Sequence, residues 1–280
     1  MNSMSIYHGV SFETSKTITR KYSTSFSLGI QFLSKQLREP IYAIYGFVRL
    51  GDEIVDTFHA HDKSALMECF KCDVRRAIAD KISINPILHS FQLTVQKYNI
   101  DSQLIEEFIE SMEMDLNRKA YTPESYKKYI LGSAEVVGLM CLKVFCQTNS
   151  TLYKKLKPSA MSLGAAYQKV NFLRDIKHDY STLGRMYFPG LSIDNFDTKA
   201  KEKLTKDIEN DFKQGYKGIN LLPLQAKFGV FLTYIYYKSL FKKIKKSSPE
   251  HLIQKRIRLS NGYKYILFLS ALFRSRLRLI

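Results

Sequence analysis

Apolar residues recur every three to four positions along most of this chain, the spacing that places them on one face of an α-helix. Segments with this period cover residues 40–57, 63–82, 86–98, 102–117, 123–147, 158–180, 198–220 and 223–245. The seven prolines suit helix starts and connections: Pro40, Pro86, Pro123, Pro158, Pro189, Pro223 and Pro249. Sustained β alternation between turn pairs is missing. The pattern predicts an all-α protein.

Nothing in this pattern divides the chain, so we predict a single domain over residues 1–280. We find no internal repeat, low-complexity tract or linker rich in Gly and Ser. Residues 1–16 are polar, so we expect no signal peptide, and the apolar runs 41–48 and 265–273 are too short to span a bilayer. We therefore expect a cytoplasmic protein that is soluble or peripheral at a membrane.

Charge narrows the class of partner. Lys and Arg number 43 against 26 Asp and Glu, a formal net charge of +17, which favours nucleic acid, an anionic membrane or phosphorylated substrates as partners. No zinc-finger spacing or RNA-binding aromatic motif is visible, so we expect no nucleic-acid partner. The pair Cys69 and Cys72 lacks a second CxxC or a histidine pair, and reduced thiols are the simpler reading of the four cysteines.

Two carboxylate patterns stand out. Asp52 and Asp56 are four residues apart, and on a helix such residues share one face. Their repulsion disfavours the arrangement unless a divalent cation binds between them, and Mg²⁺ prefers one or two carboxylates with waters and phosphate oxygens.

The same geometry returns downstream, where Asn171, Asp175 and Asp179 follow at four-residue steps. Gln168 lies on the same face, and Arg174 supplies a guanidinium able to bind phosphate. One such pair is common on solvated helices. Two pairs beside the apolar segments 41–48 and 161–166 instead indicate two carboxylate helices facing one cavity, where a small Mg²⁺ cluster could hold a diphosphate.

With these motifs the chain resembles the squalene and phytoene synthase family over about residues 15–275. The segments that carry the resemblance are 23–26, 42–56, 112–115, 129–140, 168–179 and 184–189. The resemblance implies an isoprenoid-synthase helical bundle around a deep apolar cavity, with the two aspartate motifs at its mouth. It also implies a prenyltransferase that joins two prenyl diphosphates head to head through a cyclopropylcarbinyl diphosphate.

The resemblance assigns roles to individual positions. The metal ligands it implies are Asp52, Asp56, Asn171, Asp175 and Asp179, binding Mg²⁺ or alternatively Mn²⁺. The diphosphate-binding residues are Ser23, Ser25, Arg49, Gln168, Arg174 and Arg185. Cavity tyrosines that could stabilise a cation are Tyr45, Tyr129 and Tyr187, and Asp115 is a weaker candidate. Two positions depart from the family pattern: Glu135 replaces a small residue, and Tyr22 a residue that is histidine in some relatives.

The leading expectation for the product is 15-cis-phytoene, made from two geranylgeranyl diphosphates without NADPH. The alternative is a squalene or dehydrosqualene synthase that uses two farnesyl diphosphates. A non-catalytic assembly factor is disfavoured because all four aspartates are present. We expect Ile30, one turn beyond Phe26, to face the cavity floor and leave room for the longer chain. The basic and apolar stretch 263–280 suits a final bundle helix or an anchor on an anionic membrane, and the sequence leaves the oligomeric state open.

Overall fold

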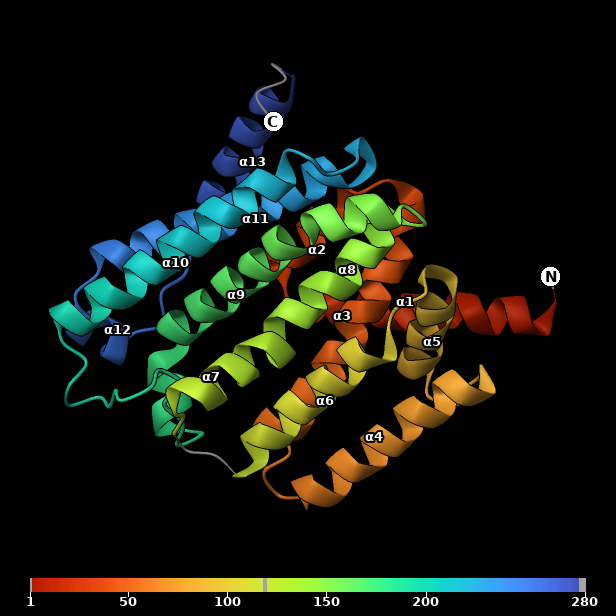
Figure 1. Cartoon of the computed structure of the whole chain (residues 1–280), viewed down its shortest axis with the longest axis horizontal. Coiled ribbons are helices and arrows are strands. Elements are labelled where there is room, and N and C mark those ends of the chain that lie inside the picture. Colours follow the sequence, from red (N-terminus) through yellow and green to blue (C-terminus); the bar gives the residue numbers. More distant parts are fainter. Residues whose placement is uncertain (1, 118–119, 277–280) are drawn as a thin grey trace.

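The computed structural model describes residues 2–117 and 120–276, and helices dominate it (Figure 1). The helices are α1 Ser3–Tyr22, α2 Thr24–Gln31, α3 Lys35–Asp56, α4 Lys63–Asp80, α5 Pro86–Tyr98, α6 Ser102–Asn117, α7 Pro123–Ile130, η1 Leu131–Glu135, α8 Val136–Cys146, α9 Ser150–Ser181, α10 Thr198–Ile219, α11 Leu224–Lys246, α12 Pro249–Gln254 and α13 Asn261–Arg276. Within the described ranges the β structure is limited to one isolated bridge, between Ala120 and Met186. The all-α prediction is therefore confirmed.

Local sequence explains where several helices begin. Asn85 caps α5 by accepting hydrogen bonds from the backbone N–H groups of Ile87 and Leu88, and Pro86 occupies the first turn. Thr122 and Ser125 form a reciprocal capping box at α7, again with a proline in the first turn. These two starts agree with the sequence prediction.

Two prolines contradict the prediction that the prolines lie at helix starts or in connections. Pro40 lies inside α3, which begins at Lys35, and Pro158 lies inside α9, which begins at Ser150. A side-chain cap sets the α9 start, because Asn149 accepts the backbone N–H of Leu152. A proline one to two turns into a helix removes one backbone hydrogen bond, and the packing of these long helices tolerates that loss.

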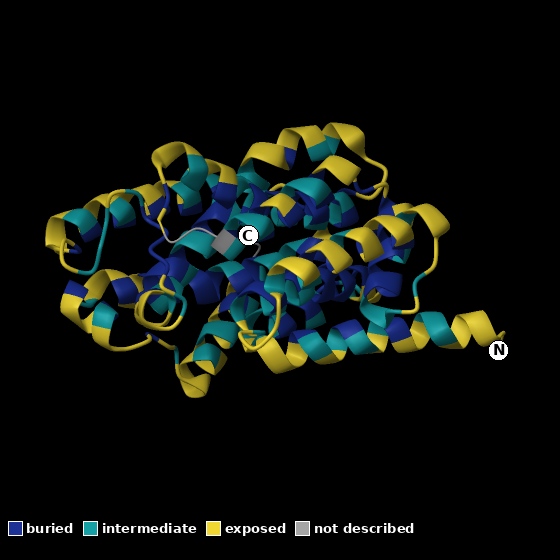
Figure 2. Cartoon of the chain, turned by 90° about the horizontal axis from the view of Figure 1, so that it is seen from below, coloured by how far each residue is buried: buried dark blue, intermediate teal, exposed yellow. Residues whose placement is uncertain are grey.

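Helix α1 has no apolar stripe, which is why its period went unrecognised. Its buried residues are the small hydroxyl side chains Ser11, Ser15 and Thr19. The hydroxyls of Ser11 and Thr19 donate to carbonyl groups of their own helix, and Ser15 bonds Ser90 of α5. With its polar groups satisfied in this way, α1 packs closely on α3 and α5, while its first turns extend beyond the body (Figure 2).

The longer helices surround one cavity. Helices α2 and α11 form one wall and approach closely at two glycines, because a Cβ on Gly29 would meet the Gly229 carbonyl oxygen at 3.0 Å. Helices α3, α8 and α9 form most of the rest, and α10 packs on α9 and adds Gly215, Gly218 and Ile219 to the lining. Buried residues fill the interior of the bundle, and exposed ones cover its outer helix faces (Figure 2).

Between α7 and α8 lies the π-helical turn η1, so residues 123–146 are continuously helical. This helix is long and apolar enough to cross a membrane by length and composition, unlike the short runs considered from sequence. However, 56% of its most apolar window is buried inside the protein, and Ser133, Ala134 and Val137 line the cavity. It therefore has the features of a core helix.

Candidate active site

The cavity has a volume of about 530 Å³ and changes character along its length. On α3 its lining runs from Ile41 and Ile44 to Asp52 and Asp56, a distance of about 22 Å along the helix. On α9 the lining also turns from apolar to charged in chain order, beginning at Leu156 and ending at Asp179. The cavity therefore has an apolar end and a charged end.

At the charged end, α3 contributes Asp52 and Asp56 together with Arg49, which contacts Asp52 at 3.9 Å and hydrogen-bonds Glu53. Loss of solvation and the nearby Asp56 carboxylate raise the pKa of Asp52 to about 7. The guanidinium of Arg49 lies over the ring of Tyr22, which ends α1. Tyr22, where the sequence departs from the family, therefore reaches the site through its aromatic face.

Helix α9 contributes the second motif. Arg174 forms a two-pronged ion pair with the adjacent Asp175, with a shortest distance of 2.6 Å, and Asn171 accepts a hydrogen bond from Tyr237 of α11. Burial, reinforced by the Asp175 and Asp56 carboxylates, raises the pKa of Asp179 to about 8. Asp56 and Asp179 line the same cavity from α3 and α9, so the two motifs face each other across it.

Behind this end lies a buried hub centred on Asp115 of α6. Its carboxylate accepts hydrogen bonds from Tyr121 at 2.5 Å, Tyr129 at 2.7 Å and Tyr187 at 3.2 Å. Arg185 bridges this hub to the first motif, because it donates to Asp56 at 2.7 Å and to the Asp115 backbone carbonyl at 2.9 Å. Asp115, weakly indicated by the sequence, thus fixes the tyrosines and the arginine in place.

An aromatic wall lies between the charged and apolar ends. Tyr167 of α9 and Tyr237 of α11 stack with their centroids 4.2 Å apart, and Phe26 of α2 contacts both rings and Tyr45 of α3. These faces line the cavity where charged residues give way to aliphatic ones. Ring faces carry negative potential and attract cations.

The structure brings most of the predicted site residues to this cavity. Its lining includes Ser23, Tyr45, Arg49, Asp52, Asp56, Tyr129, Gln168, Asn171, Arg174, Asp175, Asp179 and Tyr187. Ser25 and Arg185 are not part of the lining, and Arg185 is buried in the hub. Glu135 also lies outside it, in the electrostatic surroundings of Lys169 and Asp211, and Ser133 and Ala134 form the wall there.

Several residues of the site were missed from sequence, among them Tyr121, Tyr167, Tyr237 and Arg256. Arg256, in the segment after α12, contacts Asp175 at 2.5 Å and lines the cavity. Its only sequence signal is a basic run, Lys255, Arg256 and Arg258, in a stretch with no acidic residue after Glu250. Tyr237 has no distinguishing signal, because it is one of several tyrosines in the apolar part of α11.

The donor set suits a hard divalent cation. Within residues 2–117 and 120–276, no group of three or more His, Cys, Asp or Glu side chains lies close enough to enclose one ion. The two motifs instead present carboxylates and one amide oxygen across a shared space, where burial and then the neighbouring carboxylates raise the pKa values of Asp52 and Asp179. Mg²⁺ is held in this way, by few protein oxygens completed by water and phosphate.

Comparison with known proteins agrees with this geometry. The sequence pattern of the squalene/phytoene synthase family matches residues 19–263. A 15-cis-phytoene synthase from Synechococcus elongatus is 26% identical over 262 residues, covering 85% of this chain and 84% of its own. A chloroplastic phytoene synthase from an Oncidium hybrid cultivar is 26% identical over 247 residues, covering 81% of this chain but only 59% of the relative.

The fold has a close counterpart among solved structures. A dehydrosqualene synthase crystallised with a ligand superposes with a TM-score of 0.83 at 20% identity, covering 98% of each chain. At that identity the likeness concerns the fold, and it agrees with the helical bundle described above. The match over most of the sequence shows that this chain belongs to the squalene/phytoene synthase family, a family of prenyltransferases.

Proposed function

We propose that this protein condenses two molecules of geranylgeranyl diphosphate head to head and releases 15-cis-phytoene. The observation that carries the proposal is the graded cavity, charged at one end and apolar at the other. A prenyl diphosphate has the same two-part character, since its diphosphate needs cationic and metal partners and its hydrocarbon tail needs an apolar wall.

In this proposal the metal site consists of Asp52, Asp56, Asn171, Asp175 and Asp179. Bound Mg²⁺ supplies Lewis-acid stabilisation of the departing diphosphate. The arginines at this end already pair with the same carboxylates, Arg49 with Asp52 and both Arg174 and Arg256 with Asp175. When these carboxylates bind metal, the guanidinium groups become free to bind phosphate oxygens.

The proposed reaction has two stages. The C–O bond of the first donor breaks with its electron pair on the diphosphate, and the double bond of the second molecule attacks the allylic cation. Loss of a proton closes a cyclopropylcarbinyl diphosphate. This intermediate loses its own diphosphate, rearranges and releases a second proton, so the balance needs no reductant.

In this proposal the protein's own residues hold the substrates, orient the cavity tyrosines and shield the carbocation from water. Phe26, Tyr45, Tyr167 and Tyr237 present ring faces where the cation would form. The aliphatic lining beyond them excludes water that would quench the cation. Asp115 fixes the positions of Tyr129 and Tyr187, which line the cavity, by accepting hydrogen bonds from their hydroxyl groups.

The competing proposal is condensation of two farnesyl diphosphates. We retain this second candidate because the fold is similar to that of a dehydrosqualene synthase. Ile30 favours the longer substrate, because this residue of α2 lines the cavity and lacks the ring that would shorten it.

Incubation of the purified protein with Mg²⁺ and either prenyl diphosphate, with and without NADPH, tests the proposal. We expect phytoene from geranylgeranyl diphosphate at a higher kcat/KM, with no effect of NADPH. Faster turnover of farnesyl diphosphate to a C30 product would replace the proposal by its competitor. The absence of any condensed hydrocarbon from both substrates would refute both.

A further inference from the structure

The last described helix, α13, carries an apolar stripe that nothing in the described structure covers. Ile266, Leu269 and Phe273 are 61%, 46% and 66% exposed and lie at helical spacing on one face, with Tyr265 beside them. We call these four residues the α13 stripe. On the opposite face, Leu267, Phe268 and Ala271 pack on α11. Since α13 is already anchored, its exposed stripe is not needed for packing within the chain.

The face of α13 opposite to the stripe packs on a wall of the substrate cavity. Phe268, on the packed face of α13, contacts Phe32 at the end of α2 with centroids 4.9 Å apart, and Phe32 contacts Phe228 of α11. The next residues along, Leu33 and Gly229, line the cavity. Helices α2 and α11 therefore separate the cavity from α13 by one layer of helices.

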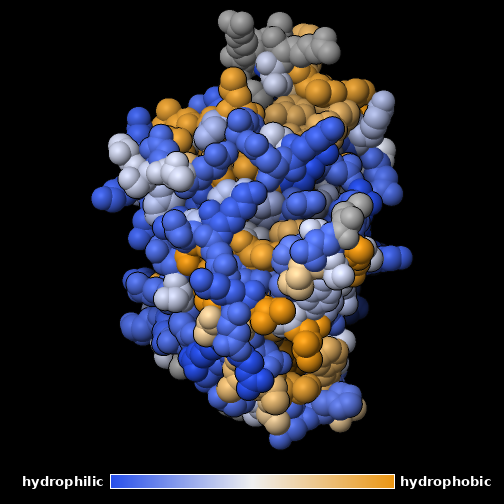
Figure 3. All heavy atoms as spheres, turned by 90° about the vertical axis from the view of Figure 1, so that its right-hand side faces the viewer, coloured by the Kyte–Doolittle hydropathy of each residue, from blue (hydrophilic) through white to orange (hydrophobic). Residues whose placement is uncertain are grey.

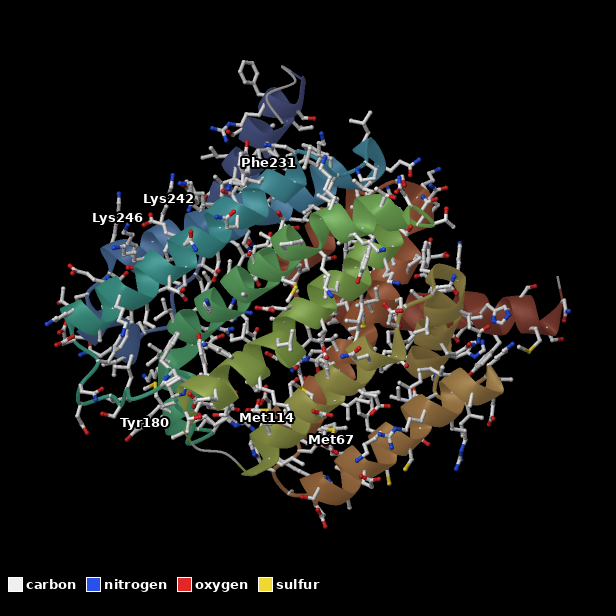
Figure 4. The ribbon with its side chains drawn as sticks, in the orientation of Figure 1. Met67, Met114, Tyr180, Phe231, Lys242 and Lys246 are labelled. Atoms are coloured by element: carbon white, nitrogen blue, oxygen red, sulfur yellow. The ribbon has the colours of Figure 1, made fainter. Side chains whose placement is uncertain are left out.

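The charged residues near the α13 stripe are basic. The sequence of α13 itself, residues 261–276, contains Lys264, Arg274 and Arg276 and no Asp or Glu. Lys242 and Lys246 project from α11 on the side of the molecule where α13 protrudes (Figures 1 and 4). Hydrophobic residues gather at that same end in the space-filling view (Figure 3). Exposed apolar side chains bordered by basic ones match an anionic lipid surface.

We propose that the α13 stripe docks on an anionic bilayer, so that α13 alone separates the lipid from the α2–α11 wall of the cavity. The purpose assigned to this docking rests on the proposed function, since a C40 hydrocarbon released into water would not dissolve. A second copy of this chain fits the surface less well. A symmetric pairing through α13 would bring two basic surfaces of this kind together without acidic partners.

Vesicle flotation of the full chain tests the docking without any substrate. The probes are phosphatidylcholine vesicles with and without phosphatidylglycerol, at low and high salt. We expect binding that requires phosphatidylglycerol and weakens with salt. Ile266→Ser, Leu269→Ser and Phe273→Ser combined should weaken it about tenfold or more, and Lys242→Gln with Lys246→Gln should do so by a similar factor.

Matched controls lie on other faces of the molecule. Ile6→Ser with Val10→Ser removes two apolar side chains of α1 that are similarly exposed, at 54% and 53%, and Arg76→Gln with Lys81→Gln removes the same charge from α4 and its end. Both controls should float like the wild type, and circular dichroism should show every variant folded. Wild-type binding that ignores phosphatidylglycerol, or controls that lose as much as the stripe variant, would overturn the docking proposal.

Light scattering tests the remaining alternative, that the α13 stripe is an interface between two copies of this chain. If the wild type is a dimer and the stripe variant a monomer, the stripe is a subunit interface and the docking proposal is wrong. If vesicles bind but no prenyl diphosphate is turned over, the docking stands and the proposed function fails. If turnover occurs without vesicle binding, the proposed function stands and the docking fails.

Discussion

The ring of Tyr22 lies over the guanidinium of Arg49, with 4.1 Å between the ring centroid and Cζ. The contact links the end of α1 to the first aspartate motif. Within the described residues, the buried Nε of Arg49 has no hydrogen-bond partner. The stacked ring fixes the plane of the guanidinium, and the unpaired N–H is a group that a bound diphosphate could satisfy.

Replacing Tyr22 by Ala should therefore raise KM for the prenyl diphosphate about three- to fivefold with little change in kcat. The stacking contact holds Arg49 in position, and its loss should cost little energy because Tyr22 is 51% exposed. Tyr22→Phe keeps the ring and should behave like the wild type. Steady-state kinetics, together with inhibition by inorganic pyrophosphate, measure the difference. If the Phe variant is impaired as much as the Ala variant, the hydroxyl is responsible and the stacking argument is wrong.

Asp115 is the residue whose loss should affect both stability and catalysis. Asp115→Asn keeps the shape but leaves the buried Arg185 with one fewer anionic partner, so we expect about 3 kcal/mol of destabilisation in urea unfolding. Turnover should fall as well, since Tyr129 and Tyr187 lose a charged acceptor. Asp194→Asn, on the exposed segment before α10, is the control and should change neither quantity. Equal stability of the two variants would contradict the role assigned to the hub.

Removing a predicted metal ligand should abolish turnover and leave the fold intact. In Asp52→Ala the like-charge repulsion from Asp56 is relieved, so helical circular dichroism and the unfolding midpoint should not fall. EDTA should inactivate the wild type, and added Mg²⁺ should restore it. Activity retained in Asp52→Ala, or in the corresponding Asp175→Ala, would exclude the two-motif mechanism.

Ile30 is 5% exposed and lines the cavity from α2. Ile30→Phe adds volume at a cavity edge rather than in close-packed core, so the fold should survive the substitution. The ratio of kcat/KM for farnesyl over geranylgeranyl diphosphate should rise, because the ring would shorten the apolar end. Ile30→Leu, which preserves volume, is the matched control. An unchanged ratio in the Phe variant would show that another residue sets the chain length.

The packing of α1 on α5 should weaken in mild acid. His89 is fully buried, its Nδ1 accepts the backbone N–H of Ser83, and its Nε2 lies 2.8 Å from Nδ1 of His8. Burial, and then His8, lower the pKa of His89 below its usual 6.5. The unfolded chain therefore binds the proton more readily, and the stability contributed by neutral His89 is present above about pH 6.5 and is lost as the pH falls toward the lowered value.

Thermal unfolding at neutral pH and at about pH 5.5 measures this effect. The midpoint of the wild type should fall more than that of His89→Gln, which has no proton to bind at this position. Equal falls in the two proteins would show that other groups cause the acid sensitivity.

The sequence predicted those parts of the site that repeat along single helices. Asp52 with Asp56, and Asn171 with Asp175 and Asp179, follow helical spacing, so the face they share could be read directly. Contacts between distant segments had no such signal. Arg256 reaches Asp175 across 81 residues, and Arg185 reaches Asp56 across 129.

The fold was predictable to a similar extent and for a similar reason. Amphipathic helices such as α5 and α6 matched the predicted bounds, because their apolar period reports burial directly. Helix α1 buries hydroxyl groups instead, and the starts of α3 and α9 lie upstream of their prolines. Both features depend on tertiary packing, which the local sequence does not encode: the burial of small polar residues in α1, and the presence of prolines inside α3 and α9.

The π-helical turn η1 has a consequence for how the length of this chain can vary. A π turn holds one more residue than an α turn while the helices on either side keep their phase. Deleting one residue within Leu131–Glu135 would therefore leave a regular helix with α8 still facing the same way. The same deletion inside α8 would rotate everything beyond it by about 100° and turn Cys141 out of the cavity wall. Along residues 123–146, tolerance of a one-residue deletion is thus confined to a single turn.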